Sequence, residues 1–408
     1  MNQQTREPIL RIIRAAVLID GQGGEPFEDQ ALIIQDGRIQ DIKPWGDEAI
    51  AEQIPKATVF DVGDVTLLPG FIDAHLHLVF DAAKGPELDP EESQQFILLR
   101  AAGNAQAALQ AGVTTVCDCG APNEIVFPLR DAIERGAIQG PRIVASGATI
   151  TTEGGHGAEH GIGRIATGVG EVRKAVVEQV EAGADFIKVM ATAGGGGDPD
   201  HSQYNLAELA AIKEEADRLG VRVAAHAHGI TGIQSCVEVG IQRIEHCSLM
   251  TPQGSVFAPE IADEIVRKGI YVCPTNVIDY RQLQQRGGSE EGLAPRSQLN
   301  VTWRRLYGHG VKLVASSDAG VTDIHCDDYA LIQELMVTEL GLSPMQAIMA
   351  GTKVAAEALG LEDKIGTLEV GKGADLVVVC GNPLEDITTL RQIRLVMRGG
   401  EVVCNRLN

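Results

Sequence analysis

Eight short apolar segments alternate with segments of helical periodicity through the middle of this chain. The apolar segments span residues 70–78, 113–119, 142–146, 185–191, 222–227, 243–247, 270–274 and 312–316. Several of the helical segments end in glycine, which readily adopts the left-handed conformation that ends a helix. Eight strands alternating with helices match the number in a closed parallel barrel. The sequence therefore predicts an α/β fold, a (β/α)8 TIM barrel; an open doubly wound sheet, usually with fewer strands, is the alternative.

Both ends of the chain have the pattern of short β-strands. Residues 9–18, 31–35 and 38–42 are strand-like, and Asp36-Gly37 between the last two is a signal for a tight hairpin. Residues 375–379 and 393–403 are again strand-like, with a Gly399-Gly400 turn. A chain of 408 residues fits a barrel of roughly 250–300 residues together with a smaller module. The ends therefore predict a small β-rich module beside the barrel.

The charge balance argues against two kinds of partner. The chain has 34 Lys and Arg residues against 56 Asp and Glu residues, a formal net charge of −22. Nucleic acids and anionic membranes bind basic surfaces, so neither is an expected partner. The eight cysteines form no CxxC pair, and the first residues lack an apolar signal region. We therefore expect a cytoplasmic protein.

Polar side chains stand at the carboxyl ends of five of the eight predicted strands. In a barrel these ends converge on one rim, where enzymes of this fold place their chemistry. A single histidine at a strand end is usually structural, but five histidines with an aspartate and a lysine form a donor set for transition metals. These residues are His75, His77, Lys188, His226, His228, His246 and Asp318. The sequence therefore predicts a metal centre at the rim.

Lys188 is unusual because it lies inside an otherwise apolar strand. A protonated lysine next to metal ions would be repelled and offers no lone pair. A neutral lysine that has reacted with carbon dioxide becomes a carbamate, an anion whose two oxygens can bridge two metals. The alternative is that Lys188 is an ordinary ion-pair partner of Asp185 or Glu153.

Six local motifs carry a family resemblance that extends over nearly the whole chain. They are Pro69-Gly-Phe-Ile-Asp-Ala-His-Leu-His77, Gly154-Gly-His-Gly157, Phe186-Ile-Lys-Val-Met190, Ala225-His-Ala-His-Gly229, Ile244-Glu-His246 and the segment 366–379. With these motifs the sequence resembles the amidohydrolase superfamily, in its two-metal branch with a carboxylated lysine. Within it, the chain is most similar to the imidazolonepropionase-related prolidases, which include Xaa-Pro dipeptidases and carboxypeptidase-like enzymes. The resemblance implies a small β-sandwich domain of residues 1–66 and 364–408 beside a barrel of residues 67–363.

The resemblance also implies a role for each strand-end residue. His75, His77 and Asp318 would hold the more buried metal, His226 and His246 the more exposed one, and carboxylated Lys188 would bridge them. Periodicity alone does not choose between His226 and His228; the family pattern favours His226 as the ligand and leaves His228 to contact the substrate or polarise its carbonyl. Two divalent ions are expected, with zinc favoured, although manganese, cobalt and iron suit the same donors.

The mechanism implied by such a centre is hydrolytic. A hydroxide shared by two metals would attack a carbonyl, and Asp318, both ligand and base, would pass the proton to the departing nitrogen. We therefore expect cleavage of an amide or peptide bond, in an Xaa-Pro-like dipeptide or an N-acyl amino acid. The same machinery acting on a xenobiotic amide, carbamate or urea is the first alternative. A one-metal deaminase and a non-enzymatic scaffold are further alternatives.

Three loop residues are candidate substrate contacts. His156 lies among glycines that let the backbone approach a ligand, although it could be a solvent-exposed histidine. The hydroxyl of Tyr204 could bind a carboxylate or could belong to the core, and His325 follows the last strand. His160, His201 and His309 are expected on the surface. No arginine stands out as an anchor for a carboxylate; the expected partner is a small molecule or dipeptide, and we expect a homo-oligomer.

Overall fold

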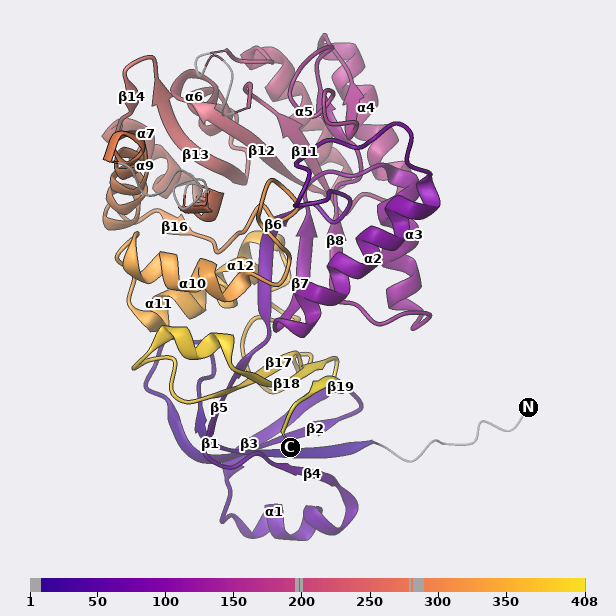
Figure 1. Cartoon of the computed structure of the whole chain (residues 1–408), viewed down its shortest axis with the longest axis vertical. Coiled ribbons are helices and arrows are strands. Elements are labelled where there is room, and N and C mark those ends of the chain that lie inside the picture. Colours follow the sequence, from indigo (N-terminus) through magenta and orange to yellow (C-terminus); the bar gives the residue numbers. More distant parts are fainter. Residues whose placement is uncertain (1–8, 195–197, 199–200, 279, 282–289, 408) are drawn as a thin grey trace, which may run out of the picture.

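The structure is a computed structural model that describes residues 9–194, 198, 201–278, 280–281 and 290–407. Its eight barrel strands match the eight segments predicted from the sequence, so the TIM barrel is confirmed. They are β6 (Phe71–Leu76), β7 (Val113–Asp118), β8 (Arg142–Ala145), β11 (Phe186–Met190), β12 (Arg222–Gly229), β13 (Arg243–Thr251), β15 (Tyr271–Cys273) and β16 (Lys312–Leu313). Figure 1 shows them in the upper part of the molecule.

Hydrogen bonds close these strands into a barrel. Strands β6, β7 and β8 pair in parallel, as do β11, β12, β13, β15 and β16. Just before β11, the Asp185 N–H donates to the carbonyl of Ala145 in β8 at 2.8 Å. On the other side, the Asp318 N–H donates to the carbonyl of His75 at 2.7 Å. Closure of the barrel therefore brings the segment of His75 into contact with the segment of Asp318.

Helices cover the outside of the barrel. They are α2 (Gln94–Gln110), α3 (Asn123–Glu134), α4 (Val169–Ala182), α5 (Leu206–Leu219), α6 (Ile230–Val239), α7 (Pro259–Lys268), α9 (Glu290–Gly308), α10 (Tyr329–Thr338), α11 (Pro344–Ala350) and α12 (Lys353–Leu359). The predicted glycine ends are real: Gly183 and Gly220, for example, close α4 and α5 with φ of 109° and 75°. Small residues of α12, among them Ala355 and Ala356, pack with Ile72 and Val314.

Both ends of the chain form one eight-stranded sheet below the barrel (Figure 1). Its strands are β1 (Leu10–Leu18), β2 (Phe27–Gln35), β3 (Arg38–Pro44), β4 (Thr58–Asp61), β5 (Val65–Pro69), β17 (Leu376–Cys380), β18 (Ile393–Arg398) and β19 (Glu401–Asn405). The predicted hairpin joins β2 and β3, and positive φ values at Asp36 (50°) and Gly37 (81°) fit a tight turn of this hand. The β-rich domain built from both termini is thus confirmed, whereas the boundaries at residues 66 and 364 stay a prediction.

The chain first passes from the terminal sheet to the barrel through a single glycine. Gly70 connects β5 of the terminal sheet directly to β6 of the barrel, and a Cβ atom there would lie 2.3 Å from the Thr114 hydroxyl oxygen. Only glycine fits this close approach. The strand that carries His75 and His77 is therefore anchored at its start by the terminal domain.

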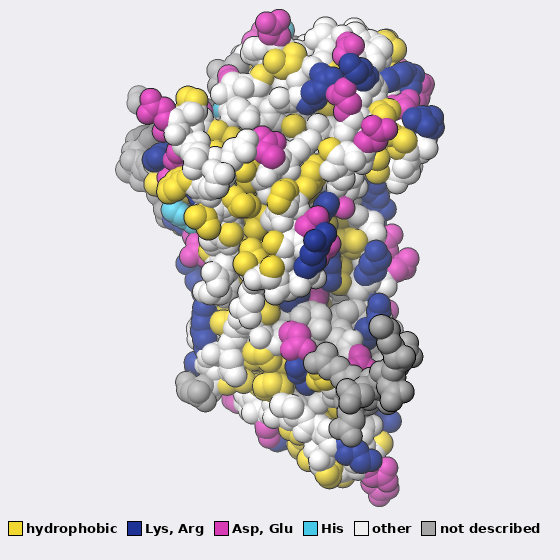
Figure 2. Space-filling model, turned by 90° about the vertical axis from the view of Figure 1, so that its right-hand side faces the viewer, with side chains coloured by type: hydrophobic (Ala, Val, Ile, Leu, Met, Phe, Trp, Pro, Cys, Tyr) yellow, Lys and Arg dark blue, Asp and Glu magenta, His cyan; other side chains and the backbone are white. Residues whose placement is uncertain are grey.

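Short elements complete the fold. They are β9 (Thr149–Thr151), β10 (Gly163–Ile165), β14 (Gly254–Ser255), α1 (Glu48–Gln53), and the 3-10 helices η1 (Ile54–Lys56) and η2 (Ile387–Arg391). On the face drawn in Figure 2, acidic and basic side chains are interspersed with apolar ones over both domains. Within the part of the chain that the structure describes, no helix has the length and apolar character needed to span a bilayer.

Candidate metal centre

The predicted strand-end residues meet in one cavity at the rim of the barrel. The cavity has a volume of about 700 Å³, and its lining includes all seven of them: His75, His77, Lys188, His226, His228, His246 and Asp318. They come from β6 and the residue that follows it, His77, from β11, β12 and β13, and from the segment after β16. Both histidine pairs, with their i, i+2 spacing, line the cavity, as the sequence predicted.

His75, His77 and Asp318 form the first of two donor clusters. Nε2 of His75 and Nε2 of His77 each lie 3.4 Å from the same oxygen, Oδ1 of Asp318. Nδ1 of His77 is 3.0 Å from the Gly120 carbonyl, and Nδ1 of His75 is 2.9 Å from the Glu245 carboxylate. Both acceptors favour a proton on Nδ1, so in the neutral rings the Nε2 atoms carry lone pairs. Lone pairs that face a carboxylate oxygen repel it unless a cation lies between them.

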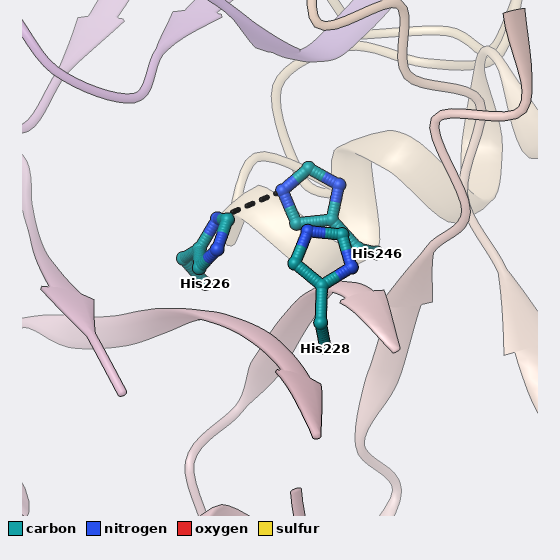
Figure 3. A group of neighbouring side chains, drawn as sticks. All are labelled: His226, His228 and His246. Carbon is teal, nitrogen blue, oxygen red and sulfur yellow. Dashed lines mark hydrogen bonds between the residues drawn. The ribbon is translucent and has the colours of Figure 1, made fainter. Parts of the chain in front are cut away.

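His226, His228 and His246 form the second donor cluster (Figure 3). Nε2 of His246 lies 2.9 Å from Nδ1 of His226, and the rings of His228 and His246 stack with centroids 4.4 Å apart. Hydroxyl groups hold the far sides of two rings: Thr275 lies 2.8 Å from His246 Nδ1, and Ser248 lies 2.9 Å from His228 Nδ1. The three rings therefore turn nitrogen atoms toward one another at one wall of the cavity.

Two residues of the clusters have strained backbones. His246 and Asp318 have φ of 66° and 57°, in the left-handed region that non-glycine residues rarely occupy. The pairing between β12 and β13 also shifts register between Ala227 and Gly229. Strain of this kind costs free energy and concentrates at functional sites. Here it aims one member of each cluster into the cavity.

Lys188 lies between the clusters and is fully buried, with 1% of its surface exposed. Its Nζ is 3.4 Å from Nε2 of His75. The suggested partner Asp185 binds Arg130 instead, at 2.9 Å, and among the described residues no carboxylate lies within ion-pair distance of Lys188. The alternative of an ordinary ion pair with Asp185 is therefore wrong. Lysine is among the residues least often fully buried unless it is paired, which sets Lys188 apart from the ion-paired lysines of the surface.

The electrostatics of both clusters suit a divalent cation. Burial holds the pKa values of His226 and His246 well below their usual range, and burial together with Lys188 lowers the pKa of His75. Burial alone would raise the pKa of Asp318, but the facing His75 and other histidines hold it well below its usual range. Neutral imidazoles and an ionised carboxylate are the forms that bind metals. The residues present therefore fit divalent ions.

The ion pair of Glu245 and Arg243, which the sequence did not mark as functional, holds Nδ1 of His75. Glu245 is fully buried, with Oε2 at His75 Nδ1 and Oε1 2.6 Å from Nε of Arg243. Arg243 also lies against the thiols of Cys117 and Cys119, at 3.2 and 3.6 Å. Glu245 directly precedes His246 on β13, yet both side chains approach His75, because the positive φ of His246 interrupts the alternation of the strand. This negative charge favours the proton on Nδ1 of His75.

Exchanging Glu245 for glutamine is expected to weaken metal binding about 10- to 100-fold, because the neutral amide no longer favours that proton. Equilibrium dialysis of the metal-free protein against zinc would measure the change. Since Arg243 is left unpaired, the single variant is also expected to lose stability. The double variant Arg243→Gln, Glu245→Gln is the control, with recovered stability and still weak metal binding. Affinity within twofold of wild type in Glu245→Gln would contradict this role.

Of the three loop residues predicted to contact the substrate, only His156 is among the described residues that line the cavity. His156 lines the cavity, with its ring centroid 4.3 Å from that of His226. Tyr204 and His325 are not among the described residues of the lining. The Tyr204 hydroxyl donates to the Ala166 carbonyl at 2.9 Å inside the core, and His325 is exposed. The prediction that Tyr204 and His325 contact the substrate is therefore wrong, because neither side chain lines the cavity.

One surface prediction is also wrong, and several lining residues were not anticipated. His201 and His309 are exposed as expected, but His160 is only 14% exposed in its side chain and lines the cavity. Ser248 could have been anticipated from its i, i+2 spacing to His246. Met250 stands near the end of β13, and other unanticipated lining residues come from loops and α9, where no local pattern marks them, among them Thr275, Ile278, Leu299, Trp303 and Val321.

Comparison with known proteins agrees with this centre. The model of the amidohydrolase family matches residues 66–403, which covers most of the chain. The chain belongs to the amidohydrolase family. Membership makes it a metal-dependent hydrolase of C–N bonds that acts on small molecules, and the scaffold alternative is set aside.

Three relatives show which members of the family this chain resembles. The chain is 30% identical to ochratoxinase of Aspergillus niger, over 98% of this chain and 87% of that protein. It is 27% identical to imidazolonepropionase of Pyrobaculum arsenaticum, over 86% of each. Among solved structures, a Xaa-Pro dipeptidase with bound methionine in its active site superposes with a TM-score of 0.84 at 29% identity, over 96% of this chain and 99% of that one. The resemblance to imidazolonepropionase-related prolidases is thus confirmed.

Proposed function

We propose that this amidohydrolase is a two-metal enzyme that cleaves an amide or peptide bond in an N-acyl amino acid or an Xaa-Pro-like dipeptide. The observation that carries the proposal is the pair of donor clusters on either side of buried Lys188. The rings of His75 and His246, one from each cluster, have centroids only 5.4 Å apart. The two clusters are therefore adjacent, so that ions held by them could share a bridging ligand.

The ligands follow from the clusters. His75, His77 and Asp318 would hold one ion, His226 and His246 the other, and Lys188, carboxylated on Nζ, would bridge them. Zinc is the proposed metal because neutral imidazole and carboxylate are its usual donors. Bound divalent ions supply Lewis acidity, which activates water and polarises a carbonyl at neutral pH. The lack of a carboxylate partner for Lys188 among the described residues supports the modification.

Proton transfer and substrate contact are assigned to side chains of the cavity. Asp318 is ionised and buried, so it would accept the proton of the attacking water and return it to the departing nitrogen. His228, fixed by Ser248, would contact the carbonyl oxygen of the substrate from the cavity side. His156, on the loop after β9, would contact the leaving group. Apolar walls around them would limit the access of bulk water.

The cavity wall supports an apolar substrate. Besides the donor clusters, the lining is largely apolar: Phe80, Ile162, Met250, Ile278, Leu299, Trp303 and Val321. Among the described lining residues, Lys188 is the only lysine and there is no arginine. The proposed substrate therefore carries a large apolar acyl or side-chain group. The same observation favours a second candidate function, hydrolysis of an uncharged apolar amide, carbamate or urea.

A substrate panel tests these two functions. Zinc-loaded enzyme would be assayed with Xaa-Pro dipeptides, N-acyl amino acids with aromatic or acetyl groups, aryl amides, carbamates and phenylureas. We expect turnover of dipeptides or N-acyl amino acids, with kcat/KM for the aromatic acyl group at least tenfold above that for acetyl. Turnover confined to the neutral compounds would favour the second function. Inactivity on the whole panel, with two metals bound, would overturn both.

A further inference from the structure

A loop on the cavity wall brings three further potential ligands together. His156, Glu159 and His160 follow β9, and none of them belongs to the two donor clusters. Nδ1 of His156 and Nε2 of His160 lie 3.2 and 3.5 Å from the same carboxylate oxygen, Oε1 of Glu159. The two rings meet edge to face, with centroids 4.9 Å apart. The group thus offers two imidazole nitrogens and one carboxylate.

The spacing of these atoms suits a tetrahedral metal. With metal–ligand bonds of about 2.0–2.1 Å, two ligand atoms of a tetrahedral zinc site lie about 3.3–3.5 Å apart. The observed 3.2 and 3.5 Å therefore need little adjustment. Glu159 is half exposed, so it can move, while the two histidine side chains are 20% and 14% exposed. A fourth position toward the cavity would be left for water.

The loop holds these residues in place without a metal. The His156 N–H donates to Gln203 Oε1 at 2.9 Å, and the Thr151 hydroxyl donates to the His156 carbonyl at 2.6 Å. Among the described residues, the Glu159 carboxylate pairs with histidines and with no lysine or arginine. Nδ1 of His160 is buried and has no hydrogen-bond partner in the part of the chain that the structure describes. The Glu159 carboxylate therefore lies between two imidazoles, with no lysine or arginine of the described residues paired to it.

We propose that His156, Glu159 and His160 form a third, weaker site for a transition metal, and that an ion bound there inhibits the enzyme. Affinity is lower because the site has three protein ligands and an exposed carboxylate, whereas the main centre is buried. Inhibition follows from position. His156 lies against His226, and both His156 and His160 line the cavity, so a bound ion would occupy space beside His226 that a substrate would fill. The inhibitory part rests on the proposed function, whereas the binding part does not.

The test counts metal ions as zinc is raised. Equilibrium dialysis with elemental analysis of the full chain would give zinc per chain for wild type and variants. We expect wild type to bind one ion at least tenfold more weakly than the others. Glu159→Gln and His160→Gln are each expected to weaken that ion at least a further tenfold and to leave the tight ions unchanged. Glu153→Gln, which changes an exposed carboxylate of the same loop, is the matched control and should resemble wild type.

The difference of one ion between wild type and variant does not depend on how many ions the main centre holds. A missing weak ion in wild type would overturn the site, as would a double variant Glu159→Gln, His160→Gln that retains it. With a substrate from the panel, excess zinc should lower wild-type kcat/KM at least tenfold and that of Glu159→Gln less than twofold. Equal inhibition of both proteins would overturn the inhibitory role.

Discussion

The variant Asp318→Asn is expected to lower kcat by roughly 10²- to 10⁴-fold, the usual contribution of a positioned acid or base. Asparagine keeps the shape of the side chain, but its amide cannot accept a proton from water and return it to nitrogen. It also removes the charge that faces the two Nε2 atoms of His75 and His77. Steady-state kinetics on the best substrate of the panel, with zinc per chain measured on the same sample, would check this result.

Metal content separates the two contributions of Asp318. If zinc per chain is unchanged and kcat still falls, the loss belongs to proton transfer. Asp327→Asn is the matched control, because Asp327 follows the same barrel strand but is exposed. Its kcat should remain within twofold of wild type. A fully loaded Asp318→Asn enzyme with wild-type kcat would contradict the proposed role of Asp318.

The variant Lys188→Met is expected to lose tight binding of at least one of the two metals and about 10³-fold or more of kcat, since the bridging ligand and part of the metal activation disappear together. Methionine fills a similar volume but cannot form a carbamate. Because Lys188 is buried without a carboxylate partner among the described residues, the metal-free variant should unfold at the same temperature as wild type or higher. Elemental analysis and thermal unfolding with and without zinc would measure both effects.

The stability that each protein gains from zinc distinguishes wild type from Lys188→Met more directly than the unfolding temperature of the metal-free proteins does. Zinc at 100 times its dissociation constant stabilises a folded protein by about 2.7 kcal/mol for each site. Wild type should therefore gain more stability from zinc than Lys188→Met does. Lys174→Met, on the exposed surface of α4, is the control and should gain as much as wild type. A Lys188→Met protein that binds two zinc ions as tightly as wild type would rule out the bridging role.

The barrel was predictable because its signals are local. Each strand is a short apolar run, and the glycine that ends many helices marks the boundary between units, so the eight strands could be counted without any knowledge of tertiary contacts. The same holds for the hairpin at Asp36-Gly37, where the turn residues determine the turn type. The domain boundary near residue 66 is harder to predict, because β5 and β6 form one nearly continuous apolar segment through Gly70.

The candidate site was predictable where side chains stand on strands and not where they stand on loops. His75, His77, His226 and His228 share faces because strand geometry fixes their direction. His160 was expected on the surface, since nothing in its local sequence reveals that the loop folds back over the cavity. Glu245 is a third case, because its position next to His246 is evident but its contact with His75 depends on closure of the barrel.

The arrangement of the terminal sheet determines when its strands can pair during synthesis on the ribosome. β5, which leads into the histidine-bearing strand β6, pairs with β1 from the start of the chain and with β17 from near its end. During synthesis, the edge of β5 that pairs with β17 therefore stays unpaired until almost the entire polypeptide has emerged from the ribosome. Unpaired edges are prone to associate with other chains. Nascent chains truncated before β17 should thus depend on chaperones more than the completed chain does.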